Sequence, residues 1–312
     1  MPALVLTPTP LEDALLTLVD PIEVTDRLKV MRQQESGTYR VFDYLKKHGE
    51  LLKRVNKPID EDCRVKMCEW CYQVVDFCKF RRETVSIGMS YLDRYLCSRP
   101  GRSALANRKE YQLTAMTALY IAIKIHEPLE METALLADLS RGCYEEMEFV
   151  HKEEELLQAL KWRVGGPTAL GFIQHYLALL PDTVHPAVAE AMMDYARYQT
   201  ELAISEHSLV DIHPSEIGLA ALLNAMEGMD VSLLSPKAQA KFVRTLEKVS
   251  GCQVEDVAVI QSTLSMLLCN LVKNDDQVLD ACEETDLERE YQTRSSPSKH
   301  RQSPVSVTRK QQ

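Results

Sequence analysis

Two helical segments in the first half of the chain each carry one charged residue on an otherwise apolar face. In LTAMTALYIAIK, Lys124 ends a face that begins at Leu113. In HKEEELLQALKW, Glu153 shares its face with Leu156 and Leu160. A charge on a buried face is unfavourable unless an opposite charge pairs with it. We therefore expect the lysine and the glutamate to pair from neighbouring helices, at an edge where another protein can contact them.

Two further helical segments show the same pattern. Arg64 lies in register with Cys68 and Tyr72, and Asp93 lies in register with Met89. Because a guanidinium group can donate two parallel hydrogen bonds to one carboxylate, this residue pair suits a buried position. We expect it to fix the register of two helices inside the core.

The composition indicates an all-α protein. Hydrophobic residues make up 45% of the 312 residues, and most of the 11 glycines fall where helical patterns end. Gly165 and Gly166 followed by Pro167 form the clearest boundary, because these residues end one helix and begin another. Helical patterns lie on both sides of it, at about 36–53, 61–79, 83–97, 109–125, 131–140 and 144–161, then 168–180, 185–204, 214–228, 236–249 and 253–272.

These patterns predict two tandem five-helix units. We expect a flexible N-terminal lead over 1–33, a first unit with a preceding helix over 34–164, and a second unit over 165–272. The segment 273–312 is first mostly acidic, then basic and rich in Ser, Gln and Pro. Since such a segment buries little apolar area, we expect a disordered tail.

Several classes of function are disfavoured. The net charge of −10 does not favour a nucleic-acid partner. No basic region precedes the apolar N-terminal residues, and no apolar run approaches the length of a membrane span, so neither secretion nor a membrane partner is expected. The nine cysteines indicate reduced thiols in the cytosol or nucleus.

No catalytic motif is visible either. The sequence has no glycine-rich phosphate loop and no nucleophile elbow. Cys68 and Cys71 lie on a core face, and no second closely spaced pair could complete a metal site. We expect no enzyme activity, no cofactor, no metal and no small-molecule substrate.

Three stretches in order resemble the cyclin family. CRVKMCEWCYQVVDFCKFRRETVSIGMSYLDRYL is similar to the opening of a cyclin box, whose pattern is Met-Arg-x-Ile-Leu-x-Asp-Trp and then a hydrophobic helix ending in Leu-Asp-Arg-Phe-Leu. LQALKWRVGGPTALGFIQHYLALLP resembles the passage into the second box, and HPSEIGLAAL resembles the matching helix there. The resemblance covers about 36–270. LKW and FIQHYL are similar to D-type cyclins, although no Leu-x-Cys-x-Glu motif is present.

The five hallmark positions of that family are matched residue by residue. The family's buried Arg–Asp pair falls on Arg64 and Asp93, its leucine on Leu113, and its kinase-binding pair on Lys124 and Glu153. The resemblance implies two cyclin folds and a regulatory subunit that binds and activates a cyclin-dependent Ser/Thr kinase, controls cell-cycle progression and acts in the nucleus and cytoplasm.

Two other functions share this architecture. A tandem five-helix core of the transcription machinery would bind DNA, and a basic face and a metal-binding ribbon would be expected with it. A cyclin-fold scaffold or transcription-related helical adaptor would not activate a cell-cycle kinase. A DNA gel shift separates the first alternative from the kinase regulator, and affinity purification followed by a histone-type kinase assay separates the second.

The C-terminal segment carries two candidate phosphorylation sites. Ser296 and Ser303 are each followed by proline, and Lys299 stands where proline-directed kinases prefer a basic residue after Ser296. A phosphate there would cancel a positive patch that includes Arg294 and Arg301. We interpret both serines as regulatory sites.

The resemblance also identifies a degenerate substrate-docking patch. The family's apolar residues, acid and glutamine fall on Cys63, Lys66, Met67, Trp70, Gln73 and Gln112. Met67, Trp70 and Gln112 fit the pattern. Lys66 replaces an apolar contact, and Gln73 lacks the negative charge that would attract a basic peptide.

We predict that Arg-x-Leu docking peptides bind this chain weakly or not at all, because the patch has lost both an apolar contact and its acid. Calorimetric titration with such a peptide checks the prediction. A sub-micromolar dissociation constant would contradict it.

Overall fold

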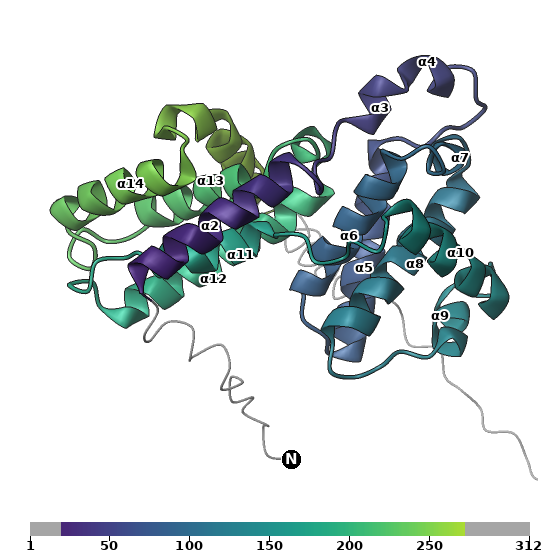
Figure 1. The fold of residues 1–312 in the computed structure, drawn as a ribbon, viewed down its shortest axis with the longest axis horizontal. Helices are drawn as coiled ribbons and strands as arrows, with labels where there is room; N and C mark the ends of the chain where they lie inside the picture. Colours follow the sequence, from purple (N-terminus) through teal and green to yellow (C-terminus); the bar gives the residue numbers. More distant parts are fainter. Residues whose placement is uncertain (1–19, 272–312) are drawn as a thin grey trace, which may run out of the picture. The chain divides into compact units, whose positions relative to one another are not determined.

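The structure is a computed structural model that describes residues 20–271 (Figure 1). Within that range the regular elements are all helices, as the periodicity predicted, and no strand occurs there. The first half contains α3 (Tyr44–Lys47), α4 (Gly49–Leu52), α5 (Glu61–Cys78), α6 (Glu83–Leu96), α7 (Arg102–Ala106), α8 (Arg108–His126), α9 (Thr133–Leu139) and α10 (Glu146–Ala159).

The second half follows the boundary at Gly165-Gly166-Pro167. It contains α11 (Ala169–Leu177), α12 (Pro186–Ser205), η1 (His207–Leu209), α13 (Pro214–Glu227), α14 (Pro236–Ser250), η2 (Val254–Val257) and a last helix over 258–271. Side-chain caps explain where several helices begin. Asp60 accepts from the Cys63 N–H at 3.0 Å at the start of α5, and Thr168 accepts from the Gly171 N–H at 2.9 Å at the start of α11.

Each half has its own hydrophobic core. In the first core α8 is buried along most of its length and packs against α5, α6, α7 and α10. The second core is built mainly from α11, α12 and α13, with Phe172 and Phe242 fully buried. Both cores belong to one unit of the chain, which ends at Leu267. The prediction of two tandem helical folds is confirmed.

The expected flexible lead is wrong for its second part, because Pro21–Ser36 forms a helix, α2. Asp20 accepts from the Ile22 N–H at 2.9 Å, and proline is favourable at the first helical position. Val24 and Leu28 are buried in the second core, where α2 packs against α11 and α14 (Figure 1). Residues 1–19 lie outside the described part of the chain.

Polar contacts also attach α2 to the second half. The buried Glu35 carboxylate accepts from the Ser215 N–H at 2.9 Å and from the Ser215 hydroxyl at 2.5 Å, at the first turn of α13. Burial raises the pKa of Glu35, although both hydrogen bonds oppose that shift.

The first helix predicted from the sequence, at 36–53, is not continuous. The structure has the end of α2 and the four-residue helices α3 and α4 in its place.

The C-terminal end of the described chain is partly apolar. Val254–Leu271 is, by length and composition alone, long and apolar enough to cross a membrane, which was not expected from the sequence. Val257, Ile260 and Leu264 of this segment are buried in the second core. The predicted disordered tail over 273–312 lies outside the described residues.

Because α2 completes the second core, we expect Leu28→Ala to lower the free energy of unfolding by about 2–5 kcal/mol. Leu28 is fully buried, whereas Val30 on the same helix is 53% exposed. The matched control Val30→Ala should change stability by no more than about 0.5 kcal/mol. Urea denaturation measures both, and equally small effects of the two substitutions would show that α2 is not part of this core.

Candidate functional site

Lys124 and Glu153 lie on α8 and α10, which pack against each other in the first core. The Lys124 ammonium donates a hydrogen bond to Glu153 Oε1 over 2.9 Å. The predicted pairing is therefore confirmed. The Lys124 side chain is 51% exposed and that of Glu153 is 17% exposed, so the ammonium group lies at the surface above a mostly covered carboxylate.

The electrostatics of this pair favour the ionised form. The hydrogen bond to Glu153 raises the pKa of Lys124 above its ordinary value. The ammonium also lies 5.5 Å from the centre of the Tyr120 ring. An ion pair with one partner this exposed contributes only about 0–1 kcal/mol to folding. The pair is thus available for recognition without being needed for stability.

Apolar side chains are exposed on α10, the helix that carries Glu153. Met147 is 57% exposed and Val150 is 43% exposed. Val150 precedes Glu153 by three residues, a spacing that places the two side chains next to each other on the helix surface. An ion pair flanked by exposed apolar groups is typical of a protein-binding surface.

The turn that ends α10 adds an exposed aromatic residue. Lys161 and Trp162 both have left-handed backbone conformations, with φ of 55° and 58°. Such conformations are uncommon for residues with bulky side chains. The Trp162 N–H donates to the Leu157 carbonyl at 2.9 Å, and the Trp162 side chain lies at the surface with 67% of the residue exposed.

Arg64 and Asp93 form the buried pair predicted from their register. The guanidinium group donates from Nη1 to Asp93 Oδ1 and from Nη2 to Oδ2, the latter at 3.0 Å. Tyr44 donates from its hydroxyl to Asp93 Oδ1 at 3.0 Å and accepts from Arg64 Nη1 at 3.1 Å. Arg64 Nε donates to the Ile204 carbonyl at 2.8 Å, which joins the first core to the end of α12.

This second pair is structural, because the Arg64 and Asp93 side chains are only 5% and 9% exposed. Leu113, the remaining hallmark residue, is also buried in the first core. Its carbonyl accepts from the Thr117 hydroxyl at 2.7 Å within α8. Neither Leu113 nor the Arg64–Asp93 pair is placed to meet a partner.

The six positions of the degenerate docking patch come from α5 and α8, which pack against each other. Cys63 and Trp70 are half-buried, Met67 is buried and Gln73 is exposed. Two of the polar side chains already have intramolecular partners. Lys66 is paired with Asp62 at 2.5 Å, and the Gln112 carbonyl accepts from the Tyr144 hydroxyl at 3.0 Å. The weak peptide binding expected of this patch stays a prediction.

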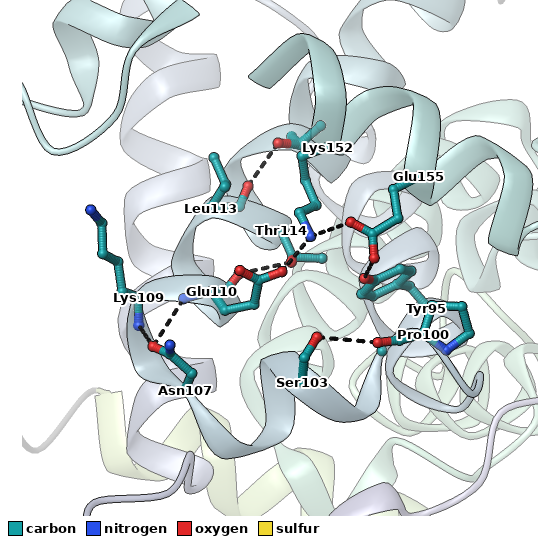
Figure 2. A network of polar contacts seen from close by, with 12 residues as sticks. Tyr95, Pro100, Ser103, Asn107, Lys109, Glu110, Leu113, Thr114, Lys152 and Glu155 are labelled. Carbon is teal, nitrogen blue, oxygen red and sulfur yellow. Dashed lines mark hydrogen bonds and ion pairs between the residues drawn. The ribbon is translucent and has the colours of Figure 1, made fainter. Parts of the chain in front are cut away.

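One buried lysine was not predicted from the sequence. Lys152 is 6% exposed and forms ion pairs with Glu110 of α8 and, at 2.6 Å, with Glu155 of α10 (Figure 2). Its register gave a signal, since Lys152 follows the buried Phe149 by three residues and precedes the buried Leu156 by four.

The remaining predictions from the sequence concern phosphorylation, metal binding and the cysteines. Ser296 and Ser303 lie outside the described residues. Within residues 20–271, no group of three or more His, Cys, Asp and Glu side chains is arranged to hold a metal ion. Cys68 and Cys71 are buried free thiols, and burial raises the pKa of each.

Comparison with known families identifies both halves of the chain. The family model of the cyclin N-terminal domain matches residues 26–165, and the model of the cyclin C-terminal domain matches residues 167–298. Together the two models span most of the chain.

The sequence identity between this chain and individual cyclins is low. Cyclin-A1-4 of Oryza sativa subsp. japonica is 27% identical over 176 residues, which are 56% of this chain and 48% of the relative. The G1/S-specific cyclin-D1 of Mus musculus is 24% identical over 232 residues, which are 73% of this chain and 76% of the relative. This chain therefore spans about half the length of some curated relatives. A-type and D-type relatives match at similar identity, so these matches do not distinguish the D-type subtype.

A solved structure supports the fold. A viral cyclin from Herpesvirus saimiri superposes with a TM-score of 0.56 and 19% sequence identity, over 79% of this chain and 96% of the viral chain. At this identity the likeness shows the fold alone.

Because Arg64 is buried with Asp93, we expect Arg64→Ala to lower the free energy of unfolding by about 3–5 kcal/mol, since the substitution leaves a buried carboxylate without its cation. Arg108 is a matched control, because its pair with Asp60 is 46% and 50% exposed. Arg108→Ala should change stability by about 0–1 kcal/mol. Thermal melts compare the two variants, and an Arg64→Ala melting temperature within a degree or two of wild type would refute the assignment.

Proposed function

Because this chain belongs to the cyclin family, we propose that it binds and activates a cyclin-dependent Ser/Thr kinase as a regulatory subunit that has no catalytic group of its own. The observation that carries the proposal is the surface ion pair of Lys124 and Glu153, 2.9 Å apart. These are the two residues that match the kinase-binding positions of the family. The remaining matched residues are buried and support the fold instead.

The geometry suits a cation that is held in place for a partner. An ammonium group has three donors, and the structure uses one of those of Lys124 for Glu153. The other two can reach carbonyl groups of a second protein that covers the half-exposed side chain. When that protein excludes water, the charge-assisted hydrogen bonds become stronger, and Glu153 keeps the ammonium paired.

Apolar contacts supply the rest of the surface. α10 and the turn after it carry the exposed side chains of Met147, Val150 and Trp162, of which Val150 lies one helical turn before Glu153. An apolar surface next to a small number of oriented polar groups is the usual composition of the centre of a protein interface. Met147 and Val150 therefore offer apolar contacts to a partner, on a helix surface that also exposes Glu146, Glu148 and Glu154.

The mechanism implied by the family is a shift between two kinase conformations. The regulatory subunit packs against the mobile helix of the kinase and holds the glutamate of that helix where it pairs with the ATP-site lysine. It also helps to order the activation loop. Because the subunit binds the active conformation better, it increases the population of active kinase.

The biological setting belongs to the same proposal. Relatives are named G1/S-specific cyclin-D1 and G2/mitotic-specific cyclin-B2, and a role in cell-cycle progression follows for this chain by analogy. We place the protein in the nucleus and cytoplasm, where such kinases act. Its free thiols fit a reducing compartment.

The experiment is affinity purification with a panel of purified cyclin-dependent kinases, followed by a histone-type kinase assay on each complex. We expect at least one kinase to be retained and its activity to rise when the chain is added. Retention without a rise in activity would favour a scaffold, and no retention by the folded chain would overturn the proposal.

For a kinase that binds, Lys124→Ala and Glu153→Ala should each weaken binding by more than about 1.4 kcal/mol, a tenfold loss, because each leaves a desolvated charge unpaired in the interface. Isothermal titration measures the affinity. Lys53→Ala is the control, since the Lys53–Glu50 pair is 73% and 82% exposed on a different helix. Unchanged affinity in folded Lys124 and Glu153 variants would count against the assignment of the surface.

A further inference from the structure

The residue immediately before Glu153 is a buried lysine that pairs in another direction. The Lys152 side chain is 7% exposed, and its ammonium pairs with Glu110 and with Glu155. Glu155 in turn accepts from the Tyr95 hydroxyl at 2.6 Å. Figure 2 shows this network, in which side chains of α6, α8 and α10 converge on one cation.

Two carboxylates, those of Glu110 and Glu155, neutralise the buried ammonium group of Lys152. Burial alone would lower the pKa of Lys152, but the two carboxylates more than reverse this effect and leave the pKa raised. The same lysine lowers the pKa of Glu155, against the opposing effect of burial. Lys152 is therefore charged at neutral pH, and its contacts are directional in a way that an apolar residue of the same length could not provide.

Adjacent residues of α10 thus reach two distant parts of α8. Glu110 lies in the first turn of α8 and Lys124 lies in its last turn. At 1.5 Å per residue these positions are about 21 Å apart along the helix. Lys152 and Glu153 are neighbours in the chain, and their side chains leave α10 in directions about 100° apart.

This arrangement restrains how α10 lies across α8. One contact holds α10 toward the start of α8, and the other holds it toward the end. Because the two contacts hold α10 toward opposite ends of α8, a tilt or an axial turn of α10 cannot change the Glu153–Lys124 contact without also changing the Lys152–Glu110 contact. The Lys152 ammonium is buried whereas the Lys124 ammonium is half-exposed, so solvent screens the contacts of Lys152 less than the Lys124–Glu153 pair.

We propose that Lys152 is a positioning residue, which uses Glu110 and Glu155 to fix the orientation of α10 and thereby holds Glu153 against Lys124. The role in partner binding rests on the proposed function, whereas the role in forming the Lys124–Glu153 pair does not. Lys152 touches no partner, because its side chain is buried.

The first test needs no kinase. The pKa of Lys124 reports the pair, since the hydrogen bond to Glu153 raises it above the ordinary 10.5. In Lys152→Met we expect the Lys124 pKa, followed by NMR titration of the labelled ammonium, to fall toward that ordinary value. The sign is decisive, because removing a nearby positive charge would by itself raise the pKa of another lysine.

An unchanged or higher Lys124 pKa in Lys152→Met would overturn the proposal. Lys152→Arg keeps the charge and should restore the wild-type pKa. The matched control is Lys109→Met, which removes an exposed cation next to Glu110 in the chain and should not lower the Lys124 pKa. If Lys152→Met does not fold, Lys152→Leu, which also cannot donate to Glu110 or Glu155, is titrated with the same two outcomes.

The second test is a double-mutant cycle of affinity for a kinase that the wild-type chain binds. We expect Lys152→Met to weaken binding about tenfold in the wild type and to have little further effect in Glu153→Gln, because both substitutions act through the same pair. Equal losses in the two backgrounds would mean that Lys152 acts only through general stability. If no kinase binds wild type, the proposed function fails, and the Lys124 titration still decides the positioning role.

Discussion

The contact between α8 and α10 is the interaction on which this account depends. Both helices must bury apolar faces, and each also carries a charge that has to be paired. At Lys124 and Glu153 the cation is half-exposed, and at Lys152 and Glu110 the cation is buried and its carboxylate partner is partly exposed. The same helix contact therefore provides a stable core and an oriented cation at its edge.

The Arg64–Asp93 pair, in contrast, is buried and serves the fold alone. Their pair is enclosed by Tyr44 and by the Ile204 carbonyl, so α3, α5, α6 and the end of α12 meet at one guanidinium group. The buried pair that stabilises the fold, Arg64 and Asp93, is thus separate from the surface pair proposed to bind a partner, Lys124 and Glu153. This separation is what allows substitutions at Lys124 or Glu153 to be informative about binding, since the fold does not need them.

Much of this could be predicted from the sequence, because helical periodicity and capping residues are local signals. α5, α6, α8 and α12 begin and end within a residue or two of their predicted bounds, and the charges at 64, 93, 124 and 153 were visible as interruptions of apolar faces. The helix α2 was missed because few of its residues are apolar. What stabilises it is the second core, whose residues are far away in the sequence.

Lys152 was missed for another reason. It lies next to Glu153 in a run of charged residues, which masked its register with the buried Phe149 and Leu156, and its partner Glu110 is on a different helix, which the sequence does not reveal. The central claim is that a kinase binds the surface formed by α8 and α10. The most direct measurement is hydrogen exchange of the backbone amides of this chain, alone and in complex with a cyclin-dependent kinase that it retains in affinity purification. We expect slower exchange for amides in the last turn of α8 and along α10 when the kinase is bound. Protection confined to α12 and α14, with α8 and α10 unchanged, would contradict it.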